Sequence, residues 1–210
     1  MFYVESYVPV YSLKAMLEVV EKSKPEENVR KFEHYIHVEK RSNTLYIYAT
    51  DSVIMAIHTT IAIDRGEDYH GVIPYWEVQK AIKDKKLRNR VSLELEKVTE
   101  DNLKCMHIHF ELAVPTEVNF KPSVLNPELL YRIHKAARWI MRGEGMKDWE
   151  HDSPFIYNNG TSNVIVYYPW LESFVGLIAP TRVVKPPKLP EWFFELTGVR
   201  VEVKEVKNDD

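Results

Sequence analysis

Residues 44–63 read TLYIYATDSVIMAIHTTIAI, and this stretch decides the fold. Apolar residues alternate with polar or aromatic ones from Leu45 to Ala49, which is the period of a strand with one buried face. Residues 53–63 continue as an apolar, β-branched strand, and Thr-Asp-Ser supplies turn chemistry between the two. The pattern therefore predicts a β-hairpin whose Asp51 accepts backbone hydrogen bonds in the turn. A catalytic role for Asp51 is the alternative.

The chain repeats this stretch. Residues 163–178, NVIVYYPWLESFVGLI, again run from an alternating strand through a polar turn into an apolar strand. The surrounding segments repeat in the same order: 35–38 matches 155–157, 71–82 matches 188–196, and 91–98 matches 199–206. Matches in a constant order indicate a duplication. We expect two copies of one α+β unit, residues 1–117 and 118–210, each with antiparallel sheets packed on one or two helices.

Composition narrows the class of protein. The 210 residues suffice for two domains of about a hundred residues each. A net charge of −3 with 28% charged residues argues against a uniformly basic nucleic-acid binder, although a local basic face remains compatible. The single cysteine, Cys105, cannot form an internal disulfide, and no stretch is apolar enough for a membrane span. We expect a cytoplasmic protein without cofactors; abundant Lys and Glu with one glutamine hint at heat adaptation.

Two predicted helices carry an excess of cations. The helix expected after Pro74, over 75–90, has six cations opposed by Glu77 and Asp84. The helix expected over 126–142 starts at an Asn-Pro cap and keeps its cations outside its apolar stripe. A protein that holds duplex DNA without reading its sequence needs such basic helices. An ordinary solvated helix face is the alternative interpretation. The candidate DNA contacts are Lys80, Lys83, Lys86, Arg88, Arg90, Arg132, Lys135, Arg138 and Arg142.

Three segments resemble the DNA sliding clamps, the processivity factors of DNA polymerases. LYIYATDSVIMAI is similar to their strand-turn-strand motif, LNPELLYRIHKAA to a helix of the bacterial clamps, and GLIAPTRV to their closing strand. Ala179 and Thr181 replace the methionines common in that strand. The resemblance is patchy over 13–183. Bacterial clamps have three such domains, whereas two copies are typical of the archaeal and eukaryotic clamps.

The resemblance implies a function as well as a fold. It implies a divergent, shortened clamp of two clamp-like domains that is not an enzyme. Its expected partners are duplex DNA and the clamp-binding peptides of DNA polymerase or other replication proteins. If a ring forms, six domains imply a homotrimer, but the second copy is abbreviated, which puts ring closure in question.

Two other functions stay open. The first is a clamp-derived assembly subunit that does not bind DNA. The second is a metal-dependent β-barrel enzyme, because His107, His109 and Glu111 alternate on one face of a predicted strand. The aromatic run 192–194 is expected in a core helix of the second copy, with partner docking as the alternative.

Overall fold

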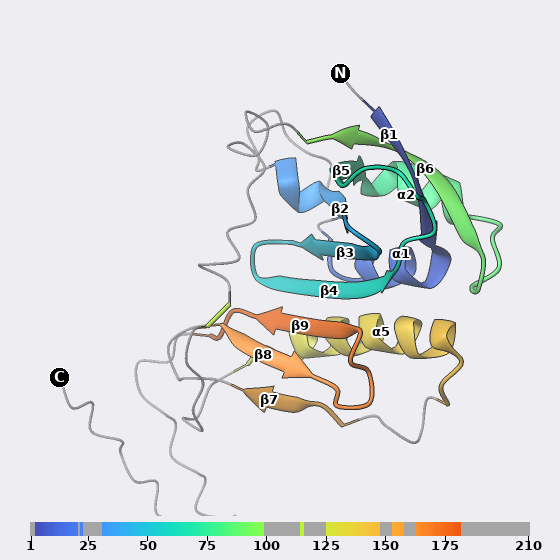
Figure 1. Ribbon diagram of the computed structural model, residues 1–210. Helices are drawn as coiled ribbons and strands as arrows, with labels where there is room; N and C mark the ends of the chain where they lie inside the picture. The colour runs from blue at the N-terminus through green and yellow to red at the C-terminus, as the bar shows by residue number, and fades with distance from the viewer. Residues whose placement is uncertain are drawn as a thin grey trace, which may run out of the picture.

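A computed structural model describes residues 3–20, 22, 31–98, 114–115, 125–147, 153–157 and 163–181. Figure 1 shows one twisted sheet with the helices gathered behind it. The strands are β1 (Tyr3–Pro9), β2 (Tyr35–Arg41), β3 (Thr44–Thr50), β4 (Ile54–Ile61), β5 (Tyr69–Pro74), β6 (Arg90–Lys97), β7 (Phe155–Tyr157), β8 (Val164–Tyr167) and β9 (Phe174–Ile178). The helices are α1 (Val10–Met16), the 3₁₀ turn η1 (Lys31–His34), α2 (Tyr75–Ile82) and α5 (Pro127–Glu144).

The sheet is antiparallel throughout, and its order exposes the repeat. The nine strands follow the order β1-β6-β5-β2-β3-β4-β9-β8-β7. Strands β2, β3 and β4 therefore mirror β7, β8 and β9 across the β4–β9 pair, where Ala56 lies opposite Gly176. The expected α+β fold of two repeated units is confirmed, and the two units share one continuous sheet. The boundary at residues 117 and 118 stays a prediction.

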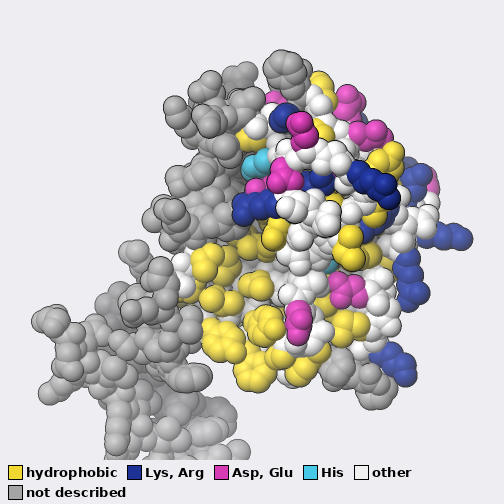
Figure 2. Space-filling model, viewed as in Figure 1, with side chains coloured by type: hydrophobic (Ala, Val, Ile, Leu, Met, Phe, Trp, Pro, Cys, Tyr) yellow, Lys and Arg dark blue, Asp and Glu magenta, His cyan; other side chains and the backbone are white. Residues whose placement is uncertain are grey.

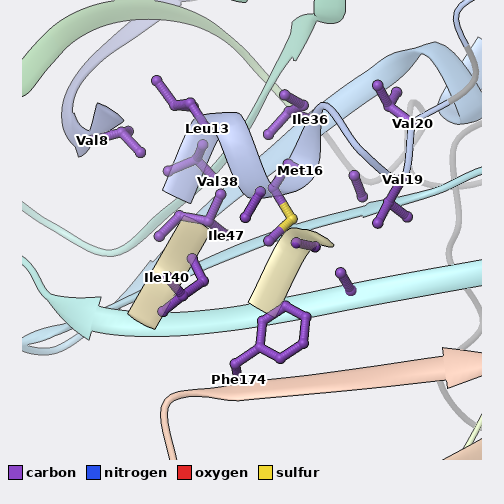
Figure 3. Close-up of a cluster of buried hydrophobic side chains, with 14 of the residues drawn as sticks. Val8, Leu13, Met16, Val19, Val20, Ile36, Val38, Ile47, Ile140 and Phe174 are labelled. Carbon is purple, nitrogen blue, oxygen red and sulfur yellow. The ribbon is translucent and has the colours of Figure 1, made fainter. Parts of the chain in front are cut away.

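The core lies between the sheet and the helix layer. Ile36, Val38 and Ile47 point from β2 and β3 toward the helices, where Met16 of α1 and Ile140 of α5 meet them (Figure 3). All of these side chains are fully buried. At about 25 cal/mol per Å² of apolar surface, this burial is the main stabilising contribution to the fold. Among the described residues, the core is one cluster that spans both units.

Glycines allow α5 to approach its neighbours closely. A Cβ at Gly176 of β9 would lie 2.5 Å from Ile133 Cγ2 of α5, and a Cβ at Gly143 would lie 2.0 Å from the Tyr11 ring. Real Cβ atoms do not tolerate such distances. Gly176 thus allows α5 to pack closely on β9, and Gly143 allows it to pack closely against Tyr11 of α1.

One predicted helix is too long. The sequence pattern predicted a helix over 75–90, but α2 ends at Ile82 and the chain turns through residues 83–89. The apolar stripe of α2 consists of Val78 and Ile82, and the next positions on that stripe are Lys85 and Lys86. Continuing the helix would turn two ammonium groups toward the core, which costs more than ending it.

Candidate nucleic-acid interface

Asp51 closes the turn of the β3–β4 hairpin. Its Oδ1 accepts hydrogen bonds from the backbone N–H groups of Val53 (3.0 Å) and Ile54 (2.9 Å). Ser52, which follows Asp51, has a φ of +72°, the left-handed conformation that a tight turn requires. The Thr50 hydroxyl donates to the Ile54 carbonyl at 2.7 Å. The predicted structural role of Asp51 is confirmed.

Arg132 uses the other oxygen of Asp51. Its Nη1 lies 2.6 Å from Asp51 Oδ2, while Nε and Nη2 donate to the carbonyls of Glu18 and Val19 at 2.9 and 2.6 Å. The side chain of Arg132 is 22% exposed and that of Asp51 is 7% exposed. The guanidinium thus joins α5 to the end of α1 and to the β3–β4 turn. Its DNA contact stays a prediction, but its geometry is that of a structural link between the units.

A second polar contact holds the carboxyl end of α5. Glu144 Oε1 accepts from the Ser173 hydroxyl at 2.7 Å and lies 3.5 Å from Nε2 of the fully buried His58. The Tyr11 ring meets His58 edge-on at 5.7 Å. Burial lowers the pKa of His58 despite the opposing attraction of Glu144. Burial also acts to raise the pKa of Glu144, but its bonds to His58 and Ser173 outweigh that and lower it.

Lys135 and Trp139 bind Glu18 where α5 crosses α1. Lys135 Nζ lies 3.1 Å from Glu18 Oε2, and Trp139 Nε1 donates to Glu18 Oε1 at 3.1 Å. Lys14 Nζ lies 4.8 Å from the centre of the Trp139 ring, a cation–π distance. Burial acts to raise the pKa of Glu18, but these two donors outweigh it and lower the pKa. Lys135, which is a candidate DNA contact, and Lys14, which is not, therefore both lie where α5 crosses α1.

The remaining candidates are Lys80 on α2, Arg90 at the start of β6, and five cations in the turn after α2 and on α5. Lys80 pairs with Glu77 at 2.9 Å on the exposed side of α2. Arg90 begins β6, where it donates to the carbonyls of Tyr7 (3.0 Å) and Ile61 (2.9 Å), so it ties strand ends together rather than lying on a helix. The cations in the turn after α2 are exposed, and so is Arg142, whereas Arg138 is half-buried; this group is Lys83, Lys86, Arg88, Arg138 and Arg142.

The sequence analysis left two cations of this region out of its candidate set. Lys85 lies in the same turn as Lys86, and Lys147 follows the end of α5; both are exposed. The run KDKKLRNR gives a local signal for Lys85. Nothing local indicates that Lys147 belongs to the same region, because that depends on how α5 packs.

The other candidate sites stay predictions. His107, His109, Glu111, Cys105 and the aromatic run 192–194 lie outside the described residues. Within the described ranges, no group of three His, Cys, Asp or Glu side chains could hold a metal ion. No helix in those ranges is long and apolar enough to cross a membrane.

The outer face of the sheet carries a pair of histidines, of which His37 is buried and His70 half-buried. His37 Nδ1 lies 3.1 Å from His70 Nε2, and His37 stacks on the Tyr48 ring at 4.9 Å. Burial, with His70 nearby, lowers the pKa of His37 to about 3. His37 is therefore neutral at physiological pH, which makes it an element of packing with a consequence for acid stability.

The comparisons with known proteins identify the fold. No protein-family model matches the sequence, and no curated protein sequence matches it. Solved bacterial sliding clamps do match the structure. The DNA polymerase sliding clamp from Bacillus subtilis aligns with a TM-score of 0.54 at 14% identity, over 86% of this chain and 64% of the clamp.

Two further clamps give similar values. The β-subunit clamp from Bartonella birtlesii, bound to griselimycin, aligns with a TM-score of 0.56 at 10% identity, over 88% of this chain and 67% of that one. The Helicobacter pylori β clamp bound to a DNA ligase peptide gives 0.53 at 9%, over 86% and 66%. The chain thus has a divergent sliding-clamp fold and spans about two thirds of the length of these proteins. The resemblance in the sequence motifs is confirmed at the level of the fold.

Proposed function

We propose that this protein is a non-enzymatic, clamp-like platform that contacts duplex DNA on the helix side of its sheet and binds partner proteins at the junction of its two units. The proposal combines the sliding-clamp fold with the distribution of charge. It places the protein in the cytoplasm, among the proteins that replicate or repair DNA.

The observation that carries the proposal is the difference between the two faces of the sheet. Glu5 and Glu94 lie opposite each other on the outer face of β1 and β6, and Glu96 follows on the same face. The helix side instead carries the exposed lysines and arginines of α2, the turn after it and the end of α5. Such an asymmetry attracts the phosphate backbone to one face while the net charge of the chain stays negative.

The proposal extends to peptide partners and self-association. Val53 is 45% exposed at the junction of the two units, where its carbonyl accepts from the Ala179 N–H at 2.7 Å. This junction would receive the apolar side chains of clamp-binding peptides. Self-association would let several copies surround a duplex, and a closed ring of six domains would be a trimer.

Salt-dependent binding of a short duplex tests the DNA contact. We expect binding of a ~30-bp duplex at about 50 mM salt, with an affinity that falls by a logarithmic slope of about 0.9 for each phosphate neutralised. Light scattering with and without DNA measures the oligomer in the same samples. Absence of any salt-dependent binding overturns the proposal.

A second candidate is an assembly subunit that does not bind DNA. The internal pairing of Arg132 with Asp51 and of Lys135 with Glu18 favours it, since these cations are already neutralised. A stable complex with a protein partner, together with indifference to DNA at low salt, would support this candidate over the first.

A further inference from the structure

The cations without a carboxylate partner gather at one end of the helix layer. Lys83, Lys85, Lys86 and Arg88 are all exposed in the turn that follows α2. Among the described residues, none of the four has a carboxylate oxygen within 4.0 Å, whereas Lys80, Arg132 and Lys135 each have one. Only an unpaired cation can replace its counterions with a phosphate without first losing an internal partner. The cations of this turn can therefore bind phosphates more readily than the paired cations on the helix faces can.

The carboxyl end of α5 lies against the same turn. A Cβ built on Gly145, the left-handed residue that ends α5, would be 3.0 Å from a guanidinium nitrogen of Arg88. Arg142, one turn earlier, lies with Cζ 5.9 Å from the centre of the Trp139 ring. Figure 2 shows Lys and Arg side chains along the right-hand edge of the molecule, the side on which α5 ends in Figure 1. We call the exposed cations at this end of the helix layer the cationic rim: Lys83, Lys85, Lys86, Arg88 and Lys147.

Two acidic groups of the described residues lie near the cationic rim. Asp84 is exposed within the turn, and Glu144 lies at the end of α5. The Glu144 carboxylate accepts from Ser173 and faces His58, so it points into the junction between the units. Among the residues that the structure describes, the five cations of the rim outnumber these two carboxylates, in a chain whose net charge is −3.

The backbone of the turn is fixed in place. Its last carbonyl, that of Asn89, accepts from the Val10 N–H at 2.9 Å, which docks the turn on the start of α1. Inside the turn, Asn89 N donates to the Lys86 carbonyl at 3.0 Å and Lys85 N donates to the Ile82 carbonyl at 3.1 Å. The cations are thus presented on a positioned backbone, which reduces the ordering cost of binding.

We propose that the cationic rim, rather than the exposed faces of the helices, is the surface that contacts the phosphates of duplex DNA. This inference rests on the proposed function and specifies which part of the helix side makes the contact. Lysines and an arginine are attracted to phosphates by their charge, and phosphates carry no sequence information, so this surface suits a contact that does not depend on sequence. A rim contact also places the duplex at the end of α5 instead of across its middle.

Two charge-matched triple variants test the inference. The rim variant carries Lys85→Gln, Lys86→Gln and Arg88→Gln, and the helix-face variant carries Lys14→Gln, Lys80→Gln and Lys135→Gln. Each removes three positive charges, and circular dichroism with thermal melting checks that both remain folded. Fluorescence anisotropy then measures the affinity for a ~30-bp duplex across a salt series, with polyglutamate of equal charge as the second probe.

We expect the rim variant to lower the logarithmic salt slope by about 2 to 3 and to weaken binding about tenfold or more near 0.1 M salt. The helix-face variant should change the affinity less than about threefold. Equal losses, or a larger loss in the helix-face variant, overturn the rim while leaving DNA contact intact. Polyglutamate binding as tight as duplex binding overturns it in favour of an acidic protein partner. If the unmodified protein binds no duplex, the proposed function fails and the inference fails with it.

Discussion

The two ends of α5 are fastened to the first unit by different chemistry. Toward its amino end, Arg132 reaches Asp51 and two carbonyls at the end of α1. At its carboxyl end, Glu144 meets His58 and Ser173, while Gly143 lets the Tyr11 ring fit against the helix. Arginine keeps its charge at every accessible pH, whereas a buried histidine titrates. The contact at the amino end of α5 therefore keeps the positive charge of Arg132 as the pH changes. The contact at the carboxyl end depends on the protonation of His58 and on close packing at Gly143.

Removing the Asp51 carboxylate should have the largest effect. We expect Asp51→Ala to lower the free energy of unfolding by about 2 to 4 kcal/mol, because it strands a mostly buried guanidinium and two backbone donors of the turn. Urea denaturation measures the change. Asp51→Asn is the matched control, since the amide oxygen can still cap the turn while the charge is lost; it should cost less. A loss under about 1 kcal/mol for Asp51→Ala would show that the ion pair does not hold this end.

Filling the space at Gly143 should have the next largest effect. The added methyl of Gly143→Ala would meet the Tyr11 ring at 2.0 Å, which we expect to cost about 1 to 3 kcal/mol of stability through repacking. Thermal and urea unfolding measure it. Gly66→Ala provides the control, because no atom lies within 4 Å of its added Cβ. Trimming Tyr11 to Ala in the Gly143→Ala background should make the two changes non-additive; simple additivity would contradict the packing argument.

Between pH 7 and 5, acid should loosen the carboxyl end of α5 rather than its amino end. The pKa of His58 is lowered in the folded protein, so below the unfolded value near 6.5 the unfolded chain binds a proton that the folded protein resists. Stability is therefore complete above about pH 6.5 and falls with pH by up to about 1.4 kcal/mol per unit for such a group. We expect His58→Gln to flatten the fall measured by urea unfolding between pH 7 and 5. His37, whose pKa is lowered to about 3, adds to the fall over the same pH range and continues it toward pH 3, and His37→Gln should remove that part. An unchanged pH profile in His58→Gln would refute the assignment.

The smallest effect should come from Lys135. Its ammonium group bridges to Glu18 near the surface, with 36% of the side chain exposed. We expect Lys135→Ala to change the free energy of unfolding by less than about 1 kcal/mol, because exposed ion pairs contribute little. A loss comparable to that of Asp51→Ala would mean that the middle of α5, rather than its ends, holds the units together.

Local patterns predicted the parts of the molecule that local chemistry determines. The β3–β4 hairpin and its Asp51 turn follow from alternation and turn residues within twenty positions, and both are confirmed. The Asn126 cap of α5 is confirmed as well, with its side chain accepting from the Glu128 N–H at 2.9 Å. The repeat was visible because its segments keep one order, and the mirrored strand order accounts for the matches up to residue 178, whereas the matches at 188–196 and 199–206 lie outside the described residues.

Long-range partners could not be predicted in the same way. Arg132 falls outside the apolar stripe of its helix, which favoured a solvent-facing DNA contact. Its partner Asp51 is 81 residues away, and only the packing of α5 beside α1 brings them together. Arg88 and Gly145 meet for the same reason. Sequence periodicity describes one helix face at a time, so it misses side chains that face a neighbouring helix.

The β4–β9 pair has a mechanical consequence. The two units are joined by a ladder of backbone hydrogen bonds that runs from Ile54 opposite Ile178 to His58 opposite Phe174. Pulling the units apart along the hydrogen-bond direction would have to unzip this ladder one rung at a time. Sliding one strand past the other would strain all rungs together. The continuous sheet thus resists bending between the units, and the twist of its strands sets its curvature.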